Sequence, residues 1–276
     1  MPRRTLVGVG AGALAIAGVA LALVAAASLA QTLPISCFVI HCEPTRANEM
    51  MFRELTDLVA LADTYAIPLT IDFTAQWADM ILAGDAKLSA VEDWIASGHE
   101  IGGHHHAYWA TLDRGAHWDG YTNTPVSELL AADQSRLLGT MSDYMTLLDA
   151  LPGERTSACM GLSGRDSIDW PSELHYGTSG HALEDCVSEP ASVDIAGVEA
   201  RQITHGLILQ EQGALAALYD ETGDAQVFAV VGHVYNFAED PRPFEFWFRF
   251  LHAQDPEGTR RQTVSAAIEE WGPNGQ

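Results

Sequence analysis

The sequence has 276 residues, of which 47% are hydrophobic, and it carries 37 acidic residues against 14 basic ones, for a net charge of −23. This length allows one large α/β domain or two small ones, and the hydrophobic content excludes an intrinsically disordered chain. The negative charge repels phosphate backbones, so we expect no nucleic-acid partner.

The first 30 residues are typical of an export segment. Arg3 and Arg4 precede an uncharged run of residues 5–27, and small residues end at Ala30. The arginine pair also fits a loose twin-arginine pattern. We predict a cleaved signal peptide, with an uncleaved membrane anchor as the alternative because the run is long enough to span a bilayer. Either way, residues 31–276 lie outside the cytoplasm, secreted or held on the outer face of the membrane.

The predicted mature chain is even more acidic. Removal of Arg3 and Arg4 leaves 12 of the 14 basic residues against 37 acidic ones, a net charge of −25, and Lys87 is the single lysine. Such a composition resembles that of proteins from extreme halophiles, where concentrated salt screens the repulsion between carboxylates. We therefore expect stability that depends on salt.

The first half of the chain alternates apolar strands with amphipathic helices. Residues 34–41 and 68–74 are β-branched and apolar, as in buried parallel strands. Thr45 is the expected cap of a helix over residues 45–65, and two further helices are predicted over residues 76–82 and 87–97, with Gly98 as their stop. A polar loop follows over residues 113–123.

The second half continues the alternation. A helix is predicted over residues 124–151, beginning at Thr124-Pro125. Strands are predicted over residues 156–161, 198–204 and 226–233, and helices over residues 167–174, 207–219, 243–252 and 259–271. This alternation favours one domain of parallel βα units, either an open sheet or a barrel.

A run of histidines follows the stop at Gly98. His99, His104, His105 and His106 fall within eight positions, where a helix ends and a strand begins. Neutral imidazole is a common metal ligand, and several imidazoles together suit zinc-like ions. Parallel strands bring their carboxyl ends to one face, so we expect this run to lie near the polar ends of the other strands, at His41, Glu43, Cys159 and His233.

The motif Gly98-His99-Glu100-Ile101-Gly102-Gly103-His104 resembles the second motif of the polysaccharide deacetylase superfamily (NodB-like, carbohydrate esterase family four). The resemblance covers about residues 35–237 and includes Ser157-Ala158-Cys159-Met160-Gly161 and the strand that ends at His233. It implies an α/β fold, a distorted (β/α) barrel of the NodB-like deacetylase type, in one domain over residues 31–276. It also implies a metal-dependent hydrolase that removes acyl groups from N-acetylated glycans.

The resemblance also implies roles for individual residues. Glu43, His104 and His106 take the metal positions, with zinc as the expected divalent ion. His41 takes the position of the general base, two residues before Glu43, so that both side chains point into the mouth of the barrel. His233 takes the position of the group that protonates the leaving amine.

Three positions depart from the family pattern. Tyr108 stands where the second metal-binding histidine is expected, so His105 or His106 must replace it, and we choose His106. Cys159 replaces the arginine that orients the catalytic aspartate, and in another alignment Cys42 occupies the base position and the mechanism fails. The alternative function is therefore a catalytically inactive domain that binds glycans or serves as an envelope structural protein. A third interpretation is a hydrolase of the same barrel acting on other amides.

The four cysteines are expected to form one or two disulfides in an oxidising compartment. They are Cys37, Cys42, Cys159 and Cys186, and Cys42–Cys159 is one candidate pair at neighbouring strand ends. The remaining histidines have no motif context and are expected at the surface or in packing. They are His117, His175, His181, His205 and His252, and His99 is expected to be structural.

Overall fold

A computed structural model describes residues 33–108, 117–154, 157–161, 174–195 and 197–271 of the chain. These belong to one compact unit, Leu33–Gln276. The predicted export segment lies outside the described residues and stays a prediction. Within the described ranges, no helix combines the length and the hydropathy needed to cross a membrane.

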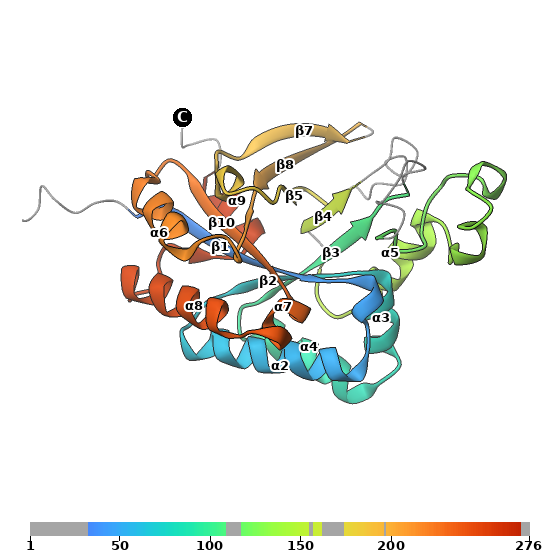
Figure 1. The fold of residues 1–276 in the computed structure, drawn as a ribbon, viewed down its shortest axis with the longest axis horizontal. Coiled ribbons are helices and arrows are strands. Elements are labelled where there is room, and N and C mark those ends of the chain that lie inside the picture. The colour runs from blue at the N-terminus through green and yellow to red at the C-terminus, as the bar shows by residue number, and fades with distance from the viewer. Residues whose placement is uncertain (1–32, 109–116, 155–156, 162–173, 196, 272–276) are drawn as a thin grey trace, which may run out of the picture. The chain divides into compact units, whose positions relative to one another are not determined.

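One mixed sheet organises this unit (Figure 1). Its strands are β1 (Ile35–Cys42), β2 (Leu69–Phe73), β3 (Glu100–His106), β4 (Ser157–Gly161), β5 (Tyr176–Ser179), β6 (Val187–Ser188), β7 (Ala191–Ile195), β8 (Val198–Thr204), β9 (Gly206–Leu207), β10 (Val227–His233) and β11 (Arg261–Gln262).

The strand order is β6-β10-β1-β2-β3-β4-β5-β8-β7, with β11 on β1 and β9 on β10. From β10 to β8 all neighbours are parallel, whereas β6 and β7 pair antiparallel at the two ends. The carboxyl ends of seven parallel strands therefore lie along one edge. The sheet curls around its inner face (Figure 1).

Helices connect the strands and cover the sheet. The α-helices are α2 (Glu49–Thr64), α3 (Ala75–Leu82), α4 (Asp85–Ala96), α5 (Met141–Asp149), α6 (Gln212–Glu221), α7 (Val234–Glu239), α8 (Arg242–Gln254) and α9 (Val264–Glu270). Short 3-10 turns are η1 (Pro44–Arg46), η3 (Val126–Glu128), η4 (Gln134–Arg136) and η6 (Glu184–Cys186).

The central strand β1 is buried on both faces, and its side chains alternate between two cores. Phe38, Ile40 and Cys42 pack with α2, α3 and α8 on the outer face. Ile35, Cys37 and Val39 pack inside the curl against α9 and β10. Because the side-chain period of a strand is two, His41 continues the inner row.

The inner face changes from apolar to polar towards the carboxyl ends of the strands. Val264, Ala267 and Ile268 of α9 pack against the lower, apolar part of β1 and β10. Beyond this core, His41 pairs across the sheet with Asp72 of β2, and His104 pairs with Cys159 of β4. The fold therefore places these four buried polar side chains together at one end.

Several predicted elements have different bounds in the structure. The long helix expected over residues 124–151 is wrong: η3, η4 and the shorter α5 occupy that region. Thr140 and Asp143 form a capping box that starts α5 anew, with hydrogen bonds in both directions. The cap of α2 is Asn48 rather than Thr45, because η1 occupies residues 44–46. The helix expected over residues 207–219 begins only at Gln212. The helix expected at 167–174 lies almost wholly outside the described residues.

Candidate metal centre

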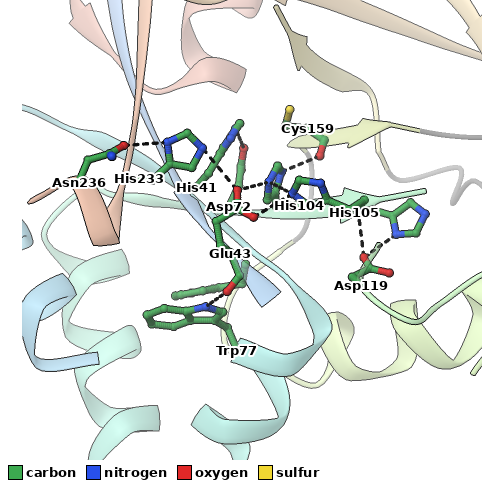
Figure 2. A network of polar contacts seen from close by, with 12 residues as sticks. His41, Glu43, Asp72, Trp77, His104, His105, Asp119, Cys159, His233 and Asn236 are labelled. Carbon is green, nitrogen blue, oxygen red and sulfur yellow. Dashed lines mark hydrogen bonds and ion pairs between the residues drawn. The ribbon is translucent and has the colours of Figure 1, made fainter. Parts of the chain in front are cut away.

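Glu43 is the centre of a cluster of imidazoles at the carboxyl edge of the sheet (Figure 2). Its Oε1 lies 3.4 Å from Nε2 of His104 and 3.4 Å from Nε2 of His233, and its Oε2 lies 3.2 Å from Nε2 of His106. The structure thus brings together four of the five predicted site residues in direct contact. They come from the ends of β1, β3 and β10.

Contacts with neighbouring helices fix the backbone on both sides of this cluster. Trp77 of α3 donates its indole N–H to the Glu43 carbonyl oxygen at 2.9 Å. Tyr144 of α5 donates its hydroxyl to the His104 carbonyl oxygen at 2.6 Å. The outer helices therefore hold the two chain segments that carry the acid and the first histidine.

Strand alternation separates the three consecutive histidines. His104 and His106 face inward, with their Nε2 atoms 2.8 Å apart. His105 faces the opposite side, where its Nδ1 lies 2.7 Å from the Asp119 carboxylate. The same Asp119 oxygen accepts the backbone N–H of His106 at 3.1 Å. Of the two candidates left open by the sequence, His106 joins the cluster and His105 does not.

The charges in the cluster depend on its burial. Burial raises the pKa of Glu43, but the imidazoles of His104, His106 and His233 around its carboxylate outweigh this effect and hold the pKa far below its usual value. Burial lowers the pKa of His104 to about 4, with the hydrogen bond to Glu43 opposing the shift. At neutral pH the group therefore holds a carboxylate beside a neutral imidazole.

These donors fit a divalent metal ion. Ligand atoms of Glu43, His104 and His106 lie within 4.8 Å of one another. The Nδ1 of His104 donates to the Cys159 carbonyl oxygen at 3.1 Å, which leaves the Nε2 lone pair facing Glu43. A backbone partner on the far nitrogen is the usual way in which a histidine ligand is oriented. One carboxylate and two imidazoles are a donor set that zinc accepts.

A cavity of about 480 Å³ opens over the cluster. Glu43, His106 and His233 form part of its wall. Arg46 and Tyr235 also line it, with the guanidinium 5.5 Å from the centre of the Tyr235 ring. The cavity gives a ligand of several rings access to the predicted metal position.

His41 lies beneath the cluster instead of in the mouth. Its side chain is 1% exposed and stacks on His104, with ring centres 3.9 Å apart. Burial lowers the pKa of His41 well below its usual value, and the neighbouring His104 lowers it further. The expectation that His41 and Glu43 both point into the mouth is therefore wrong for His41, because β1 ends before Glu43 and the chain turns there into η1.

The expected disulfides are also wrong: Cys37, Cys42, Cys159 and Cys186 are buried free thiols. Cys42 faces the outer core with Phe38 and Ile40, whereas Cys159 lies near His41 and His104 on the inner side. Strands β2 and β3 separate β1 from β4, so the two ends are not neighbours. The geometry of a disulfide cannot be met across that distance.

Several residues near the site carried no signal in the sequence analysis. His117, His181 and Asn236 line the cavity, and Asn236 Oδ1 lies 3.0 Å from Nδ1 of His233. His205 and Asp72 are buried close to His41. Asp72 could have been noticed, because it is the one charged residue in the apolar strand β2. The others became recognisable only when the fold placed them.

Two other residues of the histidine motif are placed away from the metal position. His99 accepts the Leu69 backbone N–H at its Nδ1, at 3.0 Å, and its Nε2 lies 3.1 Å from Asp63. Tyr108 donates to Asp133 and accepts the backbone N–H of Leu130. Both side chains hold local structure.

Comparisons with known proteins support the fold. No protein-family profile and no curated protein sequence matches the chain. Its structure resembles that of a Mycobacterium smegmatis protein to which polysaccharide deacetylase activity is attributed, with a TM-score of 0.52 and 12% identity over 90% of this chain and 96% of that one.

A second, weaker likeness is to a 4-alpha-glucanotransferase from Thermococcus litoralis, with a TM-score of 0.49 and 10% identity over 86% of this chain and 38% of that one. The first likeness confirms the prediction of an α/β fold of the deacetylase type, a distorted barrel in a single domain, for this divergent sequence.

Proposed function

We propose that the protein is an exported, metal-dependent hydrolase that removes acyl groups from N-acetylated glycans. The observation that carries the proposal is the convergence of His104, His106 and His233 on Glu43, at the wall of the cavity. The deacetylase-type fold supports the same substrate class. The extracytoplasmic location rests on the sequence of residues 1–30.

In this proposal Glu43, His104 and His106 hold a divalent ion, with zinc as the expected metal. When bound, such an ion supplies a Lewis acid for the acyl carbonyl oxygen and lowers the pKa of water to about 7. The chain's own contribution is to fix the backbone of two ligand residues, Glu43 through Trp77 and His104 through Tyr144.

His233 is suited to move the proton. The Asn236 Oδ1 can only accept, so Nδ1 of His233 carries the hydrogen and Nε2 of the neutral ring carries the lone pair. This Nε2 faces Glu43 at the cavity wall. His233 can therefore take the proton of the attacking water and return it to the leaving amine.

This assignment gives His233 both proton transfers and gives His41 a supporting place. A general base must reach the proton that it removes, and His41 is buried behind His104. His41 stacks on the first ligand and so helps to fix the plane of its ring.

The direct test is release of acetate from N-acetylchitooligosaccharides by the full-length protein, before and after chelation and after zinc is restored. We expect activity that is lost on chelation and restored by zinc. Glu43→Gln and His233→Asn should each lose at least about 100-fold in kcat/KM, since each removes a group that acts on the reacting atoms.

Glu92→Gln on the exposed face of α4 is a matched control for the charge change and should keep wild-type activity. The alternative function, a glycan-binding domain without catalysis, predicts binding of the same oligosaccharides by metal-free protein and no acetate release under any condition. That result would reject the hydrolase.

A further inference from the structure

A second group of metal-binding side chains lies on the inner face of the sheet, below the Glu43 cluster. His41 of β1, Asp72 of β2 and Cys159 of β4 are at most 9% exposed, and His205, which follows β8, is fully buried. Three strands and the segment after β8 thus supply an imidazole, a carboxyl, a thiol and a second imidazole on the inner face (Figure 2 labels the first three).

These side chains have unmet hydrogen-bonding capacity. Within the part of the chain that the structure describes, neither ring nitrogen of His41 or of His205 has a hydrogen-bond partner, nor does either carboxyl oxygen of Asp72. Each orphaned buried polar atom costs about 1–3 kcal/mol. Native proteins leave few such atoms, and a shared ligand would satisfy several of them at once.

The distance between His41 and Asp72 suits a small cation, and Cys159 lies close to His41. His41 Nε2 lies 3.8 Å from Asp72 Oδ2, and ligand atoms of His41, His104 and Cys159 lie within 4.8 Å of one another. The rings of His41 and His205 are 5.2 Å apart, centre to centre. Zinc bonds of about 2.0–2.3 Å at tetrahedral angles separate ligand atoms by about 3.3–3.8 Å. The His41–Asp72 pair matches this spacing, and the Cys159 thiol and the His205 ring would turn towards the pair to complete the group.

The backbone makes room for the carboxyl group. A Cβ atom at Gly102 would lie 2.1 Å from Asp72 Oδ1 and 2.9 Å from the Ser157 carbonyl oxygen. Only glycine at this position lets the Asp72 side chain extend over β3 towards β4. His104 lies against the group, but its Nδ1 donates to the Cys159 carbonyl oxygen and its Nε2 faces the Glu43 cluster.

We infer that His41, Asp72, Cys159 and His205 form a second, buried site for a zinc-like ion beneath the Glu43 cluster. Four protein ligands and no open position make it a structural site, which links β1, β2 and β4 with the end of β8. A thiolate among the donors selects zinc or cobalt over magnesium and calcium. The Glu43 cluster offers only nitrogen and oxygen donors, so the two sites can be told apart by spectroscopy.

The test is cobalt binding to the full-length protein, purified without a histidine tag and stripped of metal. Thiolate ligation gives cobalt(II) an ultraviolet charge-transfer band that a site of nitrogen and oxygen donors cannot give. We expect two equivalents of cobalt in the wild type, together with this band. Cys159→Ser should bind one equivalent and lose the band, and Asp72→Asn should weaken the binding that produces it.

Two variants serve as controls. Cys42→Ser changes a buried thiol on the outer face of β1 and should keep the band. Glu43→Gln should lose the equivalent of cobalt bound at the Glu43 cluster and keep the band. The result for the buried site therefore does not depend on whether the protein is a hydrolase. A wild type without the band in excess cobalt, or a band that survives in Cys159→Ser, would overturn the inference, and the wild-type measurement needs no variant to fold.

Discussion

At the scale of single residues, Gly102 shows how the interior is built around Asp72. A methyl group at position 102 would overlap the Asp72 carboxyl group, with the Ser157 carbonyl also too close. We expect Gly102→Ala to lower the free energy of unfolding by about 1–3 kcal/mol, as overpacking does in other cores. Urea denaturation would measure this loss.

The double variant Gly102→Ala/Asp72→Ala should recover part of the loss, because the overlapping oxygen is gone. Gly223→Ala is the matched control, since a Cβ atom there meets nothing within 4 Å. Equal destabilisation by Gly102→Ala and Gly223→Ala would show that overlap with Asp72 at position 102 does not cause the loss of stability.

Four residues of the candidate site could be predicted from the sequence. Glu43, His104, His106 and His233 could be grouped from the sequence, because parallel strands align their ends and side chains alternate along a strand. Asp72 and His205 could not be grouped with them. Their neighbours are set by how far the sheet curls, and no local pattern encodes that curl.

At the scale of elements, α5 supports the predicted metal centre from outside. Its Tyr144 is fully buried and donates its hydroxyl to the carbonyl oxygens of His104, at 2.6 Å, and Phe73, at 3.3 Å. We expect Tyr144→Phe to weaken zinc binding by about 10–100-fold, the usual effect of removing an outer partner of a ligand. A zinc titration would measure this change.

Tyr121→Phe removes a similar hydroxyl from a neighbouring tyrosine, whose ring centre is 5.6 Å from that of Tyr144. It should leave zinc affinity unchanged. Unchanged affinity in Tyr144→Phe as well would mean that α5 contributes packing alone.

The turn between α4 and β3 is held by His99, and this contact predicts a dependence on pH. Burial lowers the pKa of His99, with Asp63 opposing the shift, and its Nδ1 must be unprotonated to accept the Leu69 N–H. The folded pKa lies below the unfolded value of 6.5. The contact therefore contributes fully above pH 6.5 and is lost as the pH falls through the folded pKa.

We expect His99→Ala to cost about 1–3 kcal/mol at pH 8, because the Leu69 N–H loses its acceptor. The difference from wild type should shrink as the pH is lowered below 6.5. His175→Ala, at an exposed histidine, is the control. A difference that stays constant over this range would contradict the proposed role of His99.

Elements were predicted best where periodicity was strong. Strands β1, β2 and β10 and helices α2, α3 and α4 lie close to their predicted bounds. The single helix predicted over residues 124–151 was wrong. A proline at its start and a few apolar residues imitate one long helix, whereas a capping box at Thr140 starts the shorter α5. The short edge strands β6, β7 and β9 depend on pairing across the sheet and carry little local signal.

At the scale of the whole molecule, the net charge of −23 predicts dependence on salt. Self-repulsion of the acidic surface destabilises the compact state, and at 1 M salt it is screened over about 3 Å. We expect the midpoint of thermal unfolding to fall when the protein is dialysed from molar to millimolar potassium chloride. A midpoint that does not fall would argue against adaptation to high salt.

The arrangement of strand ends around Glu43 is best tested in a crystal soaked in zinc. We expect an anomalous difference peak about 2.0–2.2 Å from the Glu43 carboxylate and from Nε2 of His104 and His106. The same map should lose this peak in Glu43→Gln crystals. Zinc bound elsewhere, with no peak among these three side chains in the wild type, would contradict the account.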